Sequence, residues 1–151
     1  DASLFNDKEL LKIWRNNFKG IEFHDTHSDI LLHGAIDDLL EKDGKLIVID
    51  FKTRGFDLKE NTHHSYQDQL NVYNFLLRKN GHKTEDYAYL LFYMPEKVLE
   101  TGEFVLKTEL VKMNINVEHA EALFNKAVKV LNAEMSDSDE DCEYCKWGKV
   151  K

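Results

Sequence analysis

Residues 32–53, LHGAIDDLLEKDGKLIVIDFKT, decide the fold of this chain. At the centre of the stretch, Asp43-Gly44 is a strong signal for a two-residue hairpin turn, because such turns need positive φ at both central positions. The apolar residues on either side predict two adjacent antiparallel strands. The second strand, about Leu46 to Lys52, is largely apolar on both faces, which predicts a buried position in the middle of a sheet.

The hairpin turn also fixes which residues face each other. Counting outward from a two-residue turn pairs Asp37 with Asp50, and directly opposed residues point to the same face with Cβ atoms ~4.5–5.5 Å apart. Lys52 lies two residues further along and shares that face, because side chains alternate along a strand. The stretch therefore predicts a cluster of two carboxylates and one ammonium group.

Two opposed carboxylates in an apolar sheet repel each other and need a compensating charge. A hard divalent cation such as Mg²⁺ supplies it, since it takes carboxylate oxygens together with water and substrate phosphate. The cation would polarise a phosphate and lower the pKa of a bound water, and Lys52 could stabilise the attacking hydroxide. The alternative is an ordinary Asp50–Lys52 salt bridge on an exposed hairpin, which would not need a second acid. A one-residue slip would replace Asp37 with Asp38, but the turn favours Asp37.

Hydrophobic periodicity predicts the other elements. The predicted order is α-β-β-β-α-β-β-α, a mixed α/β (α+β) fold with a mixed central sheet flanked by helices. The first helix spans 6–19, with Asn6 or Asp7 as its cap and Leu10, Leu11, Trp14 and Phe18 on one face, and an extended region then runs to about Glu41. A helix is predicted over 62–80, followed by a strand over 87–94 that Pro95 ends. A further strand spans 104–115, with a slip in its alternation near Leu110–Val111. The last helix spans 117–135, and its inward residues are Ala120, Leu123, Phe124, Ala127, Val128 and Leu131.

Three motifs in this order resemble the PD-(D/E)XK nuclease superfamily, most closely its RecB-type branch. They are Gly34-x-x-Asp37, then Asp50-Phe51-Lys52-Thr53, then Gln69-x-x-x-Tyr73, and the resemblance covers about residues 30–95. The three together are specific, whereas each alone would be weak.

The resemblance implies a restriction-endonuclease-like α-β-β-β-α-β core and DNA hydrolysis that depends on Mg²⁺ or Mn²⁺. It makes Asp37, Asp50 and the backbone carbonyl of Phe51 metal ligands, and Lys52 the catalytic lysine. Gln69 and Tyr73 lie four residues apart on one helix face, which in the family lines the active site and helps to hold the substrate strand. Simple core packing is an equal alternative for Tyr73.

The chain departs from the branch at two metal-binding features. Its members often have an upstream histidine ligand, but none of His24, His27 and His33 is in an obvious position; His33, four strand residues from Asp37, would be ~13 Å away. Many also bind an iron–sulfur cluster through four cysteines, whereas this chain has only Cys142 and Cys145. We therefore expect no iron–sulfur cluster within this chain, and the pair is under-liganded for zinc.

Composition sets the remaining expectations. The 151 residues fit one domain, predicted over 1–135, followed by a flexible acidic tail over 136–151 that contains the two cysteines. The net charge of −8 is unusual for a protein that binds nucleic acid, although five of the acids lie in the tail. No apolar run is long enough for a membrane span, and the lack of a disulfide framework suggests a cytoplasmic setting. The start at Asp1 is compatible with a missing flanking domain or protein partner.

Three hypotheses follow. The first is a nuclease acting on DNA, at single strands or ends. The second is an inactive nuclease fold that binds nucleic acid or a protein, which the intact Asp37, Asp50 and Lys52 disfavour. The third is a small regulatory protein that binds a partner through its tail and the Cys-x-x-Cys motif. Basic residues that could contact a nucleic-acid backbone, or be ordinary surface charges, are Arg54, Lys59, Arg78 and Lys79, and His63 and His64 could touch phosphate or lie in a solvated loop.

Overall fold

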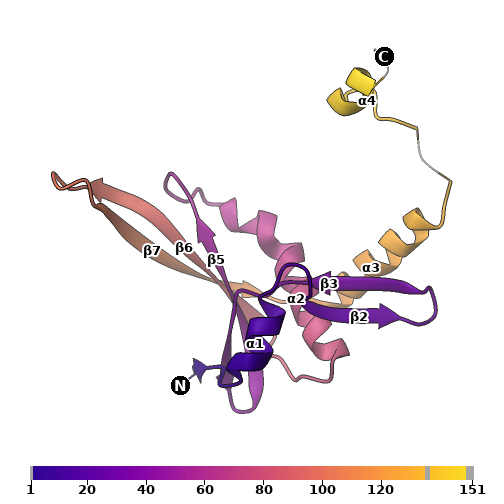
Figure 1. Ribbon diagram of the computed structural model, residues 1–151, viewed down its shortest axis with the longest axis horizontal. Helices are drawn as coiled ribbons and strands as arrows, with labels where there is room; N and C mark the ends of the chain where they lie inside the picture. The colour runs from indigo at the N-terminus through magenta and orange to yellow at the C-terminus, as the bar shows by residue number, and fades with distance from the viewer. Residues whose placement is uncertain (1, 135–136, 149–151) are drawn as a thin grey trace.

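A computed structural model, which describes residues 2–134 and 137–148, confirms the mixed α/β fold (Figure 1). A five-stranded sheet has the order β1-β4-β5-β6-β7. β5 and β6 are parallel and the other neighbours are antiparallel, so β5 occupies the predicted central position. The strands are β1 (Ser3–Leu4), β4 (Asp38–Lys42), β5 (Lys45–Thr53), β6 (Tyr87–Val98) and β7 (Phe104–Asn114).

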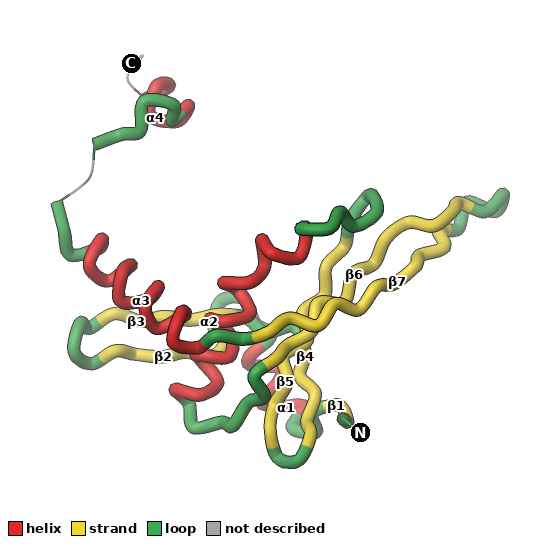
Figure 2. Tube along the Cα trace, turned by 180° about the vertical axis from the view of Figure 1, so that it is seen from behind, coloured by secondary structure: helices red, strands yellow, loops and turns green. Residues whose placement is uncertain are grey.

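The other elements are a separate hairpin and the helices, which Figure 2 distinguishes by colour. The hairpin forms a two-stranded sheet of its own. These elements are β2 (Ile21–Asp25), β3 (Ile30–Gly34), α1 (Lys8–Trp14), the 3₁₀ helix η1 (Thr62–Tyr66), α2 (Gln67–Lys79), α3 (Val117–Leu131) and α4 (Glu143–Gly148).

The hydrophobic core lies on one face of the large sheet. On β5 this is the face of the even-numbered residues Leu46 and Val48, which pack with Leu90 and Phe92 of β6. Helices α1 and α2 contribute the other side of the same core, so they cover this face. Since side chains alternate along a strand, Asp50 and Lys52 of β5 also point toward α2.

The first helix is shorter than predicted. Asp7 is its cap, as expected, because its carboxylate accepts a hydrogen bond from the Leu10 N–H at 2.9 Å. The helix ends at Trp14, and the Asn16 side chain accepts hydrogen bonds from the backbone N–H groups of Phe18 and Lys19. This local bonding competes with helix continuation. The prediction that Phe18 faces inward was wrong, since its side chain is 94% exposed.

The extended region before the turn is broken into three strands. The Asp25 carboxylate accepts hydrogen bonds from Ser28, and Asp29 has a φ of 57°, which together reverse the chain between β2 and β3. His33 therefore lies in the small sheet and Asp37 follows after that strand has ended. The ~13 Å separation predicted along one continuous strand does not apply.

The prediction that Pro95 ends its strand was wrong, because β6 continues to Val98. Pairing of β6 with β5 stops at Tyr93, so Pro95 has a strand neighbour only on the β7 side and needs no second hydrogen-bonded partner. The irregularity in this pair lies between Pro95 and Lys97, and the predicted slip at Leu110–Val111 is absent from the register.

The inward face of α3 is narrower than predicted. Only Ala120 and Phe124 are buried, while Leu131 is 69% exposed. α3 packs against α2 and the small hairpin, where the Phe124 ring lies 5.8 Å from Phe23 and 6.2 Å from Phe75. A helix surface offers a narrower contact than a sheet, which leaves the outer apolar residues uncovered. The predicted end of the domain at residue 135 and start of the tail at 136 lie outside the described residues.

Candidate active site

The predicted hairpin register is confirmed. Asp43 and Gly44 have φ of 51° and 73°, as a type I′ turn requires. Asp38 pairs with Ile49, so that Asp37, just before β4, is next to Asp50 in the same register. The Asp37 Oδ2 accepts a hydrogen bond of 2.8 Å from the Phe51 N–H, which ties the first acid to the strand that carries the second.

Asp50 is a buried acid in an unfavourable electrostatic setting. Its residue is 1% exposed, and burial raises the pKa of its carboxyl above the usual range; the neighbouring Asp37 carboxylate raises it further, and only Lys52 opposes the change. Lys52 Nζ lies 2.5 Å from Asp50 Oδ2, yet this oxygen has no directed hydrogen bond. One lysine therefore compensates the two acids incompletely.

Lys52 is held from three sides. Besides its ion pair with Asp50, its ammonium group donates a hydrogen bond of 3.0 Å to Gln69 Oε1 in α2 and lies 4.7 Å above the ring of Tyr66. The side chain is 18% exposed. These contacts fix the ammonium group beside the carboxylates while leaving it partly accessible.

Gln69 and Tyr73 continue the same network along α2. Gln69 Nε2 donates a hydrogen bond of 2.7 Å to the Tyr73 hydroxyl oxygen. Burial raises the pKa of Tyr73, and Asp50 and Asp37 raise it further. The structure thus brings all five predicted side chains together. Tyr73 fits both alternatives given for it, core packing and a place in the site, since its ring packs in the core and its hydroxyl reaches the polar cluster.

Gly34 lets the first motif lie close to α2. A Cβ atom at this position would lie 3.0 Å from Tyr73 Cε1 and 3.2 Å from Leu76 Cδ1. A contact at 3.0–3.4 Å is tighter than ordinary packing and would push the Tyr73 ring away. The glycine is therefore required by the close approach of the backbone to the helix.

Arg15, which was not predicted from the sequence, holds the backbone of Asp37 in place. Its Nε donates a hydrogen bond of 2.5 Å to the Asp37 backbone carbonyl, and its Nη2 lies 2.8 Å from Asp38 Oδ2. The neighbouring Trp14 carbonyl accepts the Ile36 N–H at 3.0 Å. No local pattern links residues 22 positions apart, so only the packed fold shows this contact.

The donor set fits a hard divalent cation held in an open site. Carboxylate oxygens of two neighbouring acids are ligands that Mg²⁺ uses together with water and phosphate, and Asp50 Oδ2 has no partner besides its ion pair with Lys52. Within residues 2–134 and 137–148, no group of three or more His, Cys, Asp and Glu side chains could hold a metal ion. The arrangement is therefore unlike a closed structural metal centre.

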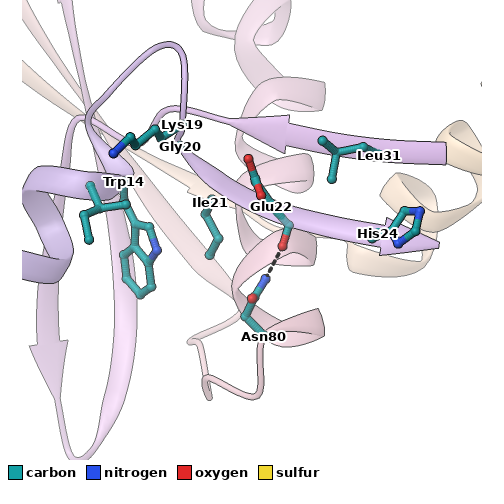
Figure 3. Close-up of a pocket in the computed structure, with 9 residues that line it drawn as sticks. Trp14, Lys19, Gly20, Ile21, Glu22, His24, Leu31 and Asn80 are labelled. Carbon is teal, nitrogen blue, oxygen red and sulfur yellow. Dashed lines mark hydrogen bonds between the residues drawn. The ribbon is translucent and has the colours of Figure 1, made fainter. Parts of the chain in front are cut away.

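The other polar candidates lie elsewhere or have other partners. His24 is hydrogen-bonded to Asp29, whereas the rings of His63 and His64 meet edge to face with their centres 4.4 Å apart. A pocket of about 470 Å³ between α1 and the small hairpin contains none of the predicted site residues; Figure 3 shows Asn80 there, bonded to the Glu22 carbonyl at 2.8 Å.

The protein is a mixed α/β protein in which a central hairpin carries two acids and a lysine, and a polar face of α2 lies against them. A sequence model of the PD-(D/E)XK nuclease superfamily matches residues 7–150, and the chain therefore belongs to that superfamily. Members of this superfamily are usually nucleases that use divalent metals.

A solved structure described as the crystal structure of SSO0001 is similar over 99% of this chain and 57% of its own, at 16% identity and a TM-score of 0.46. This chain thus spans little more than half of that structure. No curated protein matches the sequence. Among the described residues, no helix is long and apolar enough to cross a membrane.

Proposed function

We propose that this chain is a DNA nuclease of the RecB-type branch that depends on Mg²⁺ or Mn²⁺. The observation that carries the proposal is the pair of acids on one hairpin, with Asp50 buried and incompletely compensated by Lys52. Asp37, Asp50 and the Phe51 carbonyl would hold the cation. When bound, the cation supplies positive charge and lowers the pKa of its water.

Lys52 would stabilise the charge that develops at the attacked phosphate. Its ammonium group is already fixed by Asp50 and Gln69, so little reorganisation is needed during the reaction. Burial raises the pKa of Tyr73 above its usual value, so its hydroxyl keeps its proton at neutral pH and well above it. Since its oxygen accepts a hydrogen bond from Gln69 Nε2, its own hydrogen is available to another acceptor, either a carboxylate or the substrate strand.

The test is cleavage of end-labelled single-stranded and double-stranded DNA in Mg²⁺, Mn²⁺ or EDTA. Asp50→Asn and Lys52→Ala should each lower the rate by at least about 100-fold, as is typical when a group that stabilises the transition state is removed. Asp43→Asn is the matched control, because it removes an exposed acid from the same hairpin and Asn-Gly suits the turn. Metal-independent cleavage, or equal rates for all variants, would refute the assignment.

An inactive nuclease-fold module that binds nucleic acid or a protein is the second candidate. The observation in its favour is the small number of charged ligands, two carboxylates with no third acid or histidine among the described residues close enough to complete a metal centre. The same assay decides between the two: the module would bind DNA without cutting it in either metal.

A further inference from the structure

Arg54 is the arginine without an acidic partner. The chain has three arginines, at positions 15, 54 and 78. Arg15 is paired with Asp38 and Arg78 with Asp86, whereas no ion pair of the described part of the chain includes Arg54. The Arg54 Nε is buried and has no hydrogen-bond partner. Because the residue as a whole is only half-buried, its unpaired charge is suited to an anion from outside the chain.

The backbone directs Arg54 to the face of the candidate active site. Its N–H donates a hydrogen bond of 3.0 Å to the Tyr93 carbonyl, so the pairing of β5 with β6 continues one residue past Thr53. Alternation along the strand therefore puts Arg54 on the same side as Asp50 and Lys52. Each step of two residues is ~6.7 Å, comparable to the spacing of successive phosphates on an extended strand.

An exposed aromatic ring lies beside this arginine. The Arg54 guanidinium carbon is 4.7 Å from the centre of the Phe56 ring, which is 60% exposed. The loop around Phe56 is anchored: Asp57 forms an ion pair of 2.6 Å with Lys107 of β7, and Leu58 packs against the core. The ring is thus presented to solvent by a fixed segment, as in surfaces that stack unpaired bases.

We infer that Arg54 and Phe56 form a subsite for a single-stranded nucleic acid, one nucleotide away from the phosphate at Asp50 and Lys52. Arg54 contacts the adjacent phosphate, and Phe56 stacks on a base of the same strand. Because a base inside a duplex is already stacked on both sides, the subsite favours single strands or frayed ends. The inference rests on the proposed function for the position of the scissile phosphate, but not for binding itself.

The test is fluorescence anisotropy with a labelled thymidine oligonucleotide of about 12 nucleotides and a duplex of the same length, both in EDTA so that nothing is cut. Arg54→Ala should weaken binding of the single strand about tenfold and reduce the slope of log affinity against log salt by about 0.7, the loss of one phosphate contact. Phe56→Ala should weaken it about tenfold without changing the slope, and Phe56→Tyr should retain binding.

Lys129→Ala is the charge-matched control, since it removes one exposed cation from α3 and should leave both affinity and slope close to wild type. The subsite is refuted if Arg54→Ala behaves like Lys129→Ala, if the salt slope does not change, if Phe56→Ala weakens duplex and single strand equally, or if the wild type binds no single strand. If the subsite is refuted but cleavage still depends on Asp50, the proposed nuclease function stands without the subsite. Conversely, loss of binding in both variants of a protein that cuts nothing would support the subsite and reject the nuclease.

Discussion

At the level of single residues, the charge on Asp50 opposes folding when no metal is present. Its pKa is raised in the native state, first by burial and then by Asp37, from an ordinary value of 3.8. Below this value both folded and unfolded chains are protonated. As pH rises through the window between 3.8 and the native pKa, the unfolded chain loses its proton first, so stability falls and remains lower above the window.

Asp50→Asn should therefore stabilise the metal-free protein at about pH 8 and have much less effect at about pH 4. The measurement is the free energy of unfolding in urea with EDTA at both pH values. Asp43→Asn, in the exposed turn, should show no such difference between the two pH values. A wild type more stable than Asp50→Asn at the higher pH would show that Lys52 compensates the buried charge completely.

Gly34 makes a second prediction at this scale. Gly34→Ala should lower the free energy of unfolding by about 1–3 kcal/mol, because the added methyl group overpacks the contact with Tyr73 and Leu76. Gly55→Ala is the control, since a Cβ there meets no atom within 4 Å. Thermal unfolding would compare the two, and equal melting temperatures would contradict the close approach.

At the level of elements, α1 acts on the site through Arg15. This side chain touches the carbonyl of Asp37 but not the carboxylate, so its role is to position the acid. Arg15→Ala should raise the Mn²⁺ concentration needed for half-maximal cleavage about tenfold, as loss of an outer contact to a metal ligand does. Saturating Mn²⁺ should restore most of the rate.

Arg78→Ala serves as the comparison, because it removes an arginine whose partners, Thr84 and Asp86, lie away from the site. A merely destabilising effect of Arg15→Ala would lower the rate equally at all metal concentrations. Such a result would show that Arg15 does not position Asp37 for metal binding, and it would leave the proposed roles of Asp37 and Asp50 unchanged.

Elements with local signals were predicted well from the sequence. The Asp43-Gly44 turn determines its own geometry, and with it the register that brings Asp37 to Asp50. Elements whose limits depend on distant contacts were predicted poorly. α3 has an amphipathic pattern, but the width of its buried face depends on α2 and the small hairpin, and the strand at Pro95 continues because β5 ends at Thr53.

At the level of the whole molecule, the core and the candidate site share one face of the sheet. The apolar residues of β5 pack beneath α2, and Asp50 and Lys52 continue the same row toward the end of the strand. That the five candidate residues lie together could be predicted because Asp37, Asp50 and Lys52 belong to one hairpin and the other two to one face of α2. The sequence could not predict Arg15, or separate Arg54 from the other basic residues, because their partners are distant in sequence or absent.

We propose that Asp37 and Asp50 hold one divalent cation between them. The most direct test of this proposal is a crystal grown with Mn²⁺ and measured for anomalous scattering. We expect one strong peak about 2.0–2.3 Å from a carboxylate oxygen of each acid, and we expect the peak to be lost in Asp50→Asn crystals. An ordered Mn²⁺ bound elsewhere while this site stays empty, or a peak that touches only one acid, would contradict it.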